Sequence, residues 1–309
     1  VKYDINRTIS KYRKTGTFIT TGTSGLSIEQ LKECFDEDGQ KHYLGTHFFN
    51  PPYNLPLCEV IPNSLTDQVS LERIINYLER VLFRKVVVVK DSPAFLANRI
   101  GFQFLNEAMQ FAERNKNQGG IDYIDSLLGP FTGRGLAPLA TVDFVRLDIH
   151  QAIVDNVYTN TNDFSHKSFI LPSFAKHLIK ENKLGKKTKE GLYKIIKDDY
   201  GNKSYFVYDI VTDNYRTRNI NKSEFTQRLV NMLRVGDYEG YSKLLLSSSS
   251  DEAKLCRYFL AKYALYSVLV ANEVGRGIND ADIVMSYGFN WIPPSAVVKI
   301  FGGYTNLIK

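Results

Sequence analysis

The sequence lacks the features that are typical of membrane-spanning, nucleic-acid-binding and metal-binding proteins. Its longest apolar run, Val86–Val89, is far shorter than the ~20 residues that a membrane-spanning helix needs. Its three cysteines, Cys34, Cys58 and Cys256, are scattered and have no metal-ligand spacing. The formal net charge is +6, yet no run of five or six basic residues occurs. We therefore expect a cytoplasmic protein with no membrane span, no metal and no nucleic-acid partner.

The glycine fingerprint of a dinucleotide site is also absent. That site needs Gly-x-Gly-x-x-Gly after a first strand, with an acidic residue about twenty positions further on. The segment Gly133-Arg134-Gly135 lacks the third glycine and lies in a helical context. The chain begins at Val1, without a methionine, close to a segment of helical pattern at 4–14. These observations predict a cut chain whose N-terminal dinucleotide-binding part is missing.

The order of the expected elements changes near residue 91. Before it, strands and helices alternate, which is typical of an α/β sheet. We expect strands at 17–21, 42–49, 57–61 and 85–90, and helices at 4–14, after Ser27 and at 66–83. After it, helices dominate, at 97–114, 121–128, 140–158, 172–182 and 251–274. Strand-like segments at 190–217 predict a hairpin or small meander between the helical regions.

The two helical regions share a short pattern. Gly120–Asp125 and Gly277–Asp282 both have glycine, isoleucine and a final aspartate at equal spacing. Each follows a long expected helix and leads into a stretch rich in glycine and proline. This pattern predicts a duplicated helical module.

His47 and Glu59 are the strongest candidates for catalysis. They lie on two short expected strands, twelve positions apart. A carboxylate that accepts from one imidazole nitrogen fixes the tautomer and leaves the other nitrogen free for proton transfer. The spacing alone favours instead a histidine that caps a strand end and a glutamate that is a surface charge.

Several motifs in the same order resemble those of L-3-hydroxyacyl-CoA dehydrogenases. The most specific is His47–Pro51 with Glu59–Ile61, and the others are Thr23–Ile28, Asp91–Ile100 and Gly185–Tyr193. The resemblance covers residues 1–194 almost continuously and is fainter to residue 309. It is similar to the long form of the family, in which the C-terminal helical module is duplicated.

The resemblance implies roles for individual side chains. His47 would be the general base, Glu59 would support its imidazolium, and Ser24 and Asn98 would bind the reacting substrate. Ser24 and Asn50 would lie near the nicotinamide of NAD, and Lys187 would contact the dinucleotide. Ser24 could instead be a turn residue, Asn98 a local helix partner and Lys187 a solvated lysine.

The resemblance also implies the architecture. The fold class would be α/β followed by all-α, with the C-terminal part of a Rossmann-type NAD-binding domain and two 6-phosphogluconate-dehydrogenase-like helical modules. The expected bounds are 1–90 for the partial NAD-binding domain, 91–194 for the first helical copy, 195–250 for a hairpin and linker region, and 251–309 for a partial second copy.

The implied function is oxidation of (3S)-3-hydroxyacyl-CoA to 3-oxoacyl-CoA with NAD+ in fatty-acid β-oxidation. The partners would be acyl-CoA and either a second copy in a homodimer or the paired helical modules of one chain. The missing cofactor-binding part predicts that the chain as given is inactive. One alternative is a non-catalytic remnant that serves in assembly or acyl-CoA binding. Another is a related β-hydroxyacid or sugar-nucleotide dehydrogenase, which would use a lysine from the helical part.

Four positions depart from the family pattern. Gly22 stands where the family usually has asparagine, and Gly25 where it often has serine. Ala94 and Arg146 both stand where the family has glycine. These departures indicate a divergent branch that keeps its chemistry.

Overall fold

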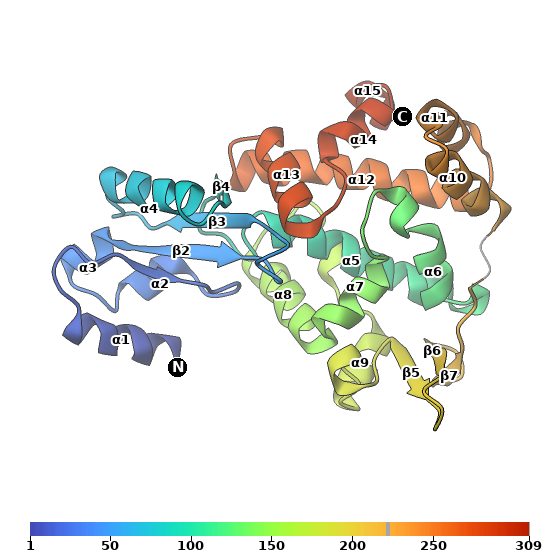
Figure 1. The fold of residues 1–309 in the computed structure, drawn as a ribbon, viewed down its shortest axis with the longest axis horizontal. Helices are drawn as coiled ribbons and strands as arrows, with labels where there is room; N and C mark the ends of the chain where they lie inside the picture. The colour runs from blue at the N-terminus through green and yellow to red at the C-terminus, as the bar shows by residue number, and fades with distance from the viewer. Residues whose placement is uncertain (221–222, 309) are drawn as a thin grey trace. The chain divides into compact units, whose positions relative to one another are not determined.

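The computed structural model describes residues 1–220 and 223–308, and they divide into two compact units (Figure 1). The first unit contains residues 1–100 and 267–295. The second contains residues 101–266 and the C-terminal segment from Ala296. Within the described part of the chain, no helix is long and apolar enough to cross a membrane.

A four-stranded mixed sheet forms the centre of the first unit, in the order β1-β2-β3-β4. The strands are β1 (Ile19–Thr21), β2 (Tyr43–Phe48), β3 (Leu57–Pro62) and β4 (Lys85–Val88). β2 and β3 pair antiparallel, whereas β1 with β2 and β3 with β4 pair parallel. A short loop suffices to join β2 to β3, while the parallel pairs are joined through helices, as parallel strands require.

Helices cover this sheet and support its turns. Those before residue 96 are α1 (Lys2–Tyr12), α2 (Ile28–Lys32), α3 (Glu37–Lys41) and α4 (Gln68–Arg80). Leu71 and Leu78 of α4 pack on the sheet, in a buried cluster with Leu44, Cys58 and Val60. The helix expected after Ser27 is confirmed, and the Ser27 side chain is its N-cap, since it accepts from the backbone N–H of Gln30.

The first unit also contains a segment from near the end of the chain. It comprises the C-terminal part of α12 (Asp251–Val274), α13 (Ile278–Val284) and the π-helix η5 (Met285–Phe289). α13 contacts β3 and β4, and η5 contacts β3. Backbone N–H of Lys90 donates to the carbonyl of Val274, which ties the end of α12 to the segment after β4. Residues more than 170 positions apart therefore share one core.

The second unit is mainly helical. Its elements include most of α5 (Ala97–Arg114), then η1 (Lys116–Gln118), α6 (Ile121–Leu127), η2 (Pro130–Thr132), α7 (Pro138–Val145), α8 (Leu147–Asn160), η3 (His166–Phe169), α9 (Ser173–Lys180) and η4 (Lys186–Thr188). An antiparallel sheet of β5 (Tyr193–Lys197), β6 (Lys203–Asp209) and β7 (Asn214–Thr217) follows. This sheet confirms the meander expected at 190–217. Helices α14 (Pro294–Ile300) and α15 (Tyr304–Leu307) end the described chain.

The region 195–250 differs from the expected hairpin and linker. Besides the sheet, it contains α10 (Glu224–Arg234) and α11 (Tyr238–Ser247). The signal was present in the sequence, because Phe225 and Leu229 recur at helical spacing and are buried. Residues 221–222, within the same region, lie outside the described part. The domain bounds themselves stay a prediction.

The two copies of the glycine–aspartate pattern share a helix start and a side-chain hydrogen bond. α6 begins directly after Gly120, and α13 begins directly after Gly277. The carboxylate of Asp125 accepts from the N–H of Leu139, and that of Asp282 accepts from the N–H of Ser295. Leu139 and Ser295 each follow the proline that opens α7 or α14. The matching hydrogen bonds support the predicted duplication.

Candidate active site

His47 and Glu59 face each other across the antiparallel pair β2–β3. They are direct partners in the strand register, so their side chains project from the same face. His47 Nδ1 lies 2.7 Å from Glu59 Oε2, and both residues are buried. The twelve-residue separation is therefore a consequence of the hairpin geometry.

Glu59 is fully buried and has donors on both carboxylate oxygens. Oε1 accepts from the backbone N–H groups of Leu96 and Ala97, at 3.1 and 2.8 Å. These groups lie at the start of the 18-residue helix α5, where backbone N–H groups have no intrahelical partner and the helix dipole is positive. Oε2 accepts from His47. Removing this carboxylate would leave several buried donors without a partner.

The other nitrogen of His47 faces Ser24. His47 Nε2 lies 3.0 Å from Ser24 Oγ, on the turn that follows β1. Glu59 accepts a hydrogen bond from Nδ1–H, so neutral His47 has its acceptor lone pair on Nε2. The Ser24 hydroxyl donates to that nitrogen. A substrate hydroxyl placed near Ser24 would meet a nitrogen that can accept its proton.

Two phenylalanines border the His47 ring. Phe49 lies edge-on at a centroid distance of 4.6 Å, and Phe95 lies at 5.4 Å. Both are buried, so the imidazole has apolar surfaces beside it and hydrogen-bond partners at its two nitrogens. Water is excluded from much of the ring, which strengthens the electrostatic contact with Glu59.

The remaining expected site residues lie in different places. Asn98 is buried at the second position of α5, one residue after the Ala97 N–H that binds Glu59. Asn50 is exposed and lies just beyond the end of β2. Lys187 is exposed in η4 and belongs to the second unit, so the structure does not place it at this site.

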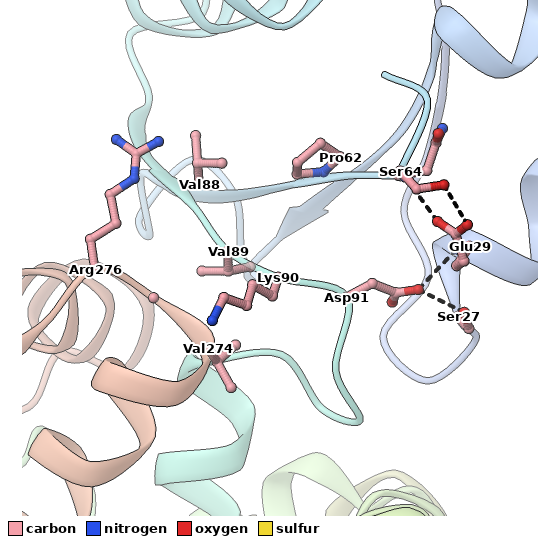
Figure 2. A pocket seen from close by; sticks show the side chains of 12 residues that line it. Ser27, Glu29, Pro62, Ser64, Val88, Val89, Lys90, Asp91, Val274 and Arg276 are labelled. Carbon is pink, nitrogen blue, oxygen red and sulfur yellow. Dashed lines mark hydrogen bonds between the residues drawn. The ribbon is translucent and has the colours of Figure 1, made fainter. Parts of the chain in front are cut away.

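Asp91 binds the start of α2, three residues after Ser24, and sequence reasoning missed this role. Its Oδ2 accepts from the Ser27 hydroxyl at 2.6 Å and from the Glu29 N–H at 2.9 Å. Figure 2 shows these bonds at one end of a pocket of about 570 Å³, where Glu29 in turn binds Ser64. Asp91 opens the motif segment 91–100, which was the available signal.

Arg99 was also missed. Its guanidinium is fully buried and binds both oxygens of Glu273 on α12, at 2.9 and 3.1 Å. This bidentate pair joins the helix that supports Glu59 to the late segment of the first unit. Nothing in the sequence pairs residues 174 positions apart. Among residues 1–220 and 223–308, no group of three His, Cys, Asp or Glu side chains is arranged to hold a metal ion.

Family models match the two halves of the motif-bearing region. Residues 1–92 match the NAD-binding domain of 3-hydroxyacyl-CoA dehydrogenase, and residues 95–195 match its C-terminal domain. The α/β unit and the helices after it thus define the class, an NAD-binding oxidoreductase, which confirms the expected cofactor and fold class. Within that class, the chain belongs to the 3-hydroxyacyl-CoA dehydrogenase family.

Individual relatives agree with this assignment. A probable 3-hydroxyacyl-CoA dehydrogenase of Bacillus subtilis is 33% identical over 94% of this chain and 36% of its own length. One of Deinococcus radiodurans is 34% identical over 64% of this chain and 56% of its own length. The chain therefore spans less than two thirds of either relative. The structure of 3-hydroxybutyryl-CoA dehydrogenase from Escherichia coli K12 matches 99% of this chain and 74% of its own, with a TM-score of 0.68 and 17% identity, which shows the shared fold.

The match at residues 1–92 corrects one expectation. The absent glycine fingerprint predicts that the N-terminal part of the NAD-binding domain is missing, yet residues 1–92 match the family model of that domain. The fingerprint marks one turn of such a domain, whereas β1, β2 and β3 carry other parts of it. The prediction that the chain is inactive depends on the same missing cofactor-binding part and is not supported.

Proposed function

We propose that this chain carries the catalytic centre of a (3S)-3-hydroxyacyl-CoA dehydrogenase. The reaction converts the substrate to 3-oxoacyl-CoA while NAD+ becomes NADH. The observation that carries the proposal is the series of hydrogen bonds from the buried Glu59 through the buried His47 to Ser24. The non-catalytic alternative is not favoured by the family match.

The residues present fit the nicotinamide end of the cofactor. β1 and β2 run parallel, and Ser24 and Asn50 follow their carboxyl ends, which is where ligands bind to open α/β sheets. Beside them, a Cβ built on Gly25 would have nothing within 4 Å, so there is open space next to this turn. Bound NAD+ supplies the acceptor for the hydride that leaves C3 of the substrate.

His47 would act as the general base. Its Nε2 removes the proton of the 3-hydroxyl as the hydride leaves C3. Nδ1 keeps its own proton throughout and donates it in a hydrogen bond to Glu59. The resulting imidazolium is stabilised by the Glu59 carboxylate, which the N–H groups of α5 already hold in place.

Ser24 and Asn98 would position the substrate. The Ser24 hydroxyl lies within hydrogen-bond reach of His47 Nε2, so a substrate hydroxyl there can contact both groups. The Asn98 side-chain amide makes no hydrogen bond within the part of the chain that the structure describes, and it offers both a donor and an acceptor. Orientation of this kind lowers the barrier by restricting the reacting groups before reaction.

The substitution His47→Gln tests the proposal. Glutamine keeps a donor toward Glu59 but cannot accept a proton, so we expect turnover to fall at least ~100-fold. The measurement is NADH formation from a (3S)-3-hydroxyacyl-CoA, with thermal unfolding as the control for folding. Turnover close to that of the wild type would remove His47 from the mechanism.

Other parts of the assignment stay predictions. These are the role in fatty-acid β-oxidation, the acyl-CoA partner, the cytoplasmic setting and the contact of Lys187 with NAD. The choice between a homodimer and helical modules paired within one chain also stays open to measurement.

A further inference from the structure

We propose that the π-helix η5 positions His47 for catalysis, acting through Phe49. This inference rests on the proposed function, since it assigns η5 a role in the same reaction. It makes Phe289 a positioning residue that sits more than 200 positions from the base it supports.

A chain of aromatic contacts leads from η5 to the base. The Phe289 ring lies 6.1 Å from that of Phe49, and the Phe49 ring lies 4.6 Å from the His47 imidazole. Phe49 is buried and packs between the two. Aromatic pairs at such separations have preferred edge or tilted geometries, so each ring restricts the orientation of the next.

Gly288 allows η5 to approach this closely. A Cβ built at Gly288 would lie 2.5 Å from Leu57 Cδ2 and 3.3 Å from Phe49 Cδ1. Leu57 is fully buried at the start of β3, so it has little room to move away. A side chain at position 288 would therefore push η5 from the strand and from Phe49.

The wider turn of η5 is itself anchored. The N–H of Trp291 donates to the carbonyl of Met285 at 3.0 Å, and the buried Trp291 ring packs on Phe289 at 5.2 Å. A π-turn inserts one residue relative to an α-helix, and such turns are frequent at functional sites. In η5, the adjacent residues Gly288 and Phe289 both contact the site: Gly288 lies against Leu57, and Phe289 lies against Phe49.

The consequence for His47 concerns its surroundings more than its hydrogen bonds. Glu59 and Ser24 define the plane of the ring, and Phe49 and Phe95 close off its sides. Without the Phe289 ring, Phe49 gains space and water reaches the imidazole. Small displacements of a catalytic group reduce turnover far more than substrate affinity.

The test uses Phe289→Leu, which keeps apolar volume and removes the ring. We expect kcat to fall about tenfold while KM changes less than about twofold. Phe289→Tyr keeps an aromatic ring at this position and should keep kcat close to that of the wild type. Tyr287→Leu is the matched control, because Tyr287 is on the same π-helix but faces Lys85. Gly288→Ala should reproduce the effect of Phe289→Leu.

A second readout does not depend on turnover. Diethyl pyrocarbonate modification of His47, followed by mass spectrometry, should be faster in Phe289→Leu and unchanged in Tyr287→Leu. Unchanged kcat and unchanged modification in both Phe289→Leu and Gly288→Ala would overturn the proposal. An active His47→Gln variant would instead refute the proposed function, while the modification rates would still report on positioning.

Discussion

Glu59 is held by N–H donors from two parts of the chain. Its Oε1 binds the start of α5, and its Oε2 binds His47. Because an ionised carboxylate only accepts, His47 must present Nδ1–H to it and keep the Nε2 lone pair for Ser24 or substrate. The residue thus sets which nitrogen of His47 can act as a base.

The substitution Glu59→Gln tests that control of the tautomer. The amide carbonyl can still accept from Leu96 and Ala97, but the amide NH₂ then faces His47 Nδ1 and reverses the tautomer. We expect kcat to fall roughly 10²–10⁴-fold, as when a base is held in the wrong tautomer. The measurement is steady-state NADH formation. A fall of less than about threefold would show that Glu59 does not orient the base.

Arg146 has a backbone conformation that favours glycine. Its φ is 96° and its ψ is 139°, at the junction of α7 and α8. Its guanidinium binds Asp148, which explains a local use for the side chain. Ala94 likewise has a φ of 64°. Both stand where the resemblance leads us to expect glycine, the residue that adopts a positive φ most readily.

Two variants of Arg146 separate strain from the ion pair. Arg146→Ala removes the contact with Asp148 and keeps the Cβ, whereas Arg146→Gly removes both. We expect Arg146→Gly to be more stable than Arg146→Ala by about 1 kcal/mol, because only glycine relieves the strain. Urea unfolding gives the comparison. Equal stability of the two variants would show that position 146 is unstrained.

At the level of elements, local patterns could be predicted well. α5 and α12 have the bounds that helical periodicity indicates, 97–114 and 251–274. The site was accessible because His47 and Glu59 lie on strands joined by one short hairpin loop, so the sequence spacing translates directly into a cross-strand pair. Contacts of this kind depend on few intervening residues.

Contacts between distant segments could not be predicted. Phe289 and Glu273 reach the first unit only because residues 267–295 pack on its sheet, and no periodicity encodes that choice. The motif Gly185–Tyr193 predicts a cofactor contact for its lysine, but the structure gives a clear reason for its first glycine. A Cβ at Gly185 would lie 2.1 Å from the Asp143 carbonyl oxygen. The Asp143 side chain accepts from the N–H groups of Leu192 and Tyr193, which fixes the start of β5.

The Arg99–Glu273 pair links α5 to α12, and a substitution tests how much this link stabilises the fold. Glu273→Gln would leave the buried guanidinium without its bidentate carboxylate. Because Glu273 is partly exposed, water can compensate in part, and we expect a loss of about 1–2 kcal/mol in unfolding free energy. Glu252→Gln, on the same helix but outside this pair, is the control. A loss equal to that of the control would show that the pair contributes nothing specific.

For the whole molecule, buried groups of the second unit give opposing dependences on pH. Burial lowers the pKa of His150 to about 3, so its contribution to stability is complete above pH 6.5 and decreases as the pH falls toward 3. Burial raises the pKa of Asp125 and of Asp143 to about 6. Their contributions are complete below pH 3.8 and decrease as the pH rises toward 6. The pH dependence of the wild-type unfolding free energy therefore does not reveal the contribution of each group.

The variant His150→Gln isolates one of these parts. Glutamine can keep a hydrogen bond to Asn106 but takes up no proton in the unfolded state. The stability advantage of the wild type over this variant should shrink as the pH falls from 6.5 to 4.5, by up to about 1.4 kcal/mol per pH unit. Urea unfolding at several pH values measures it. An advantage that is constant with pH would mean that His150 is not kept neutral by burial.

The central claim is that His47 and Glu59 act as one unit in removing the substrate's hydroxyl proton. The most direct test compares turnover in His47→Gln, Glu59→Gln and the double variant under saturating (3S)-3-hydroxyacyl-CoA and NAD+. If the two residues act together, the double variant will be about as slow as the slower single variant. Losses that multiply would contradict the account, because they would mean that the two side chains contribute independently.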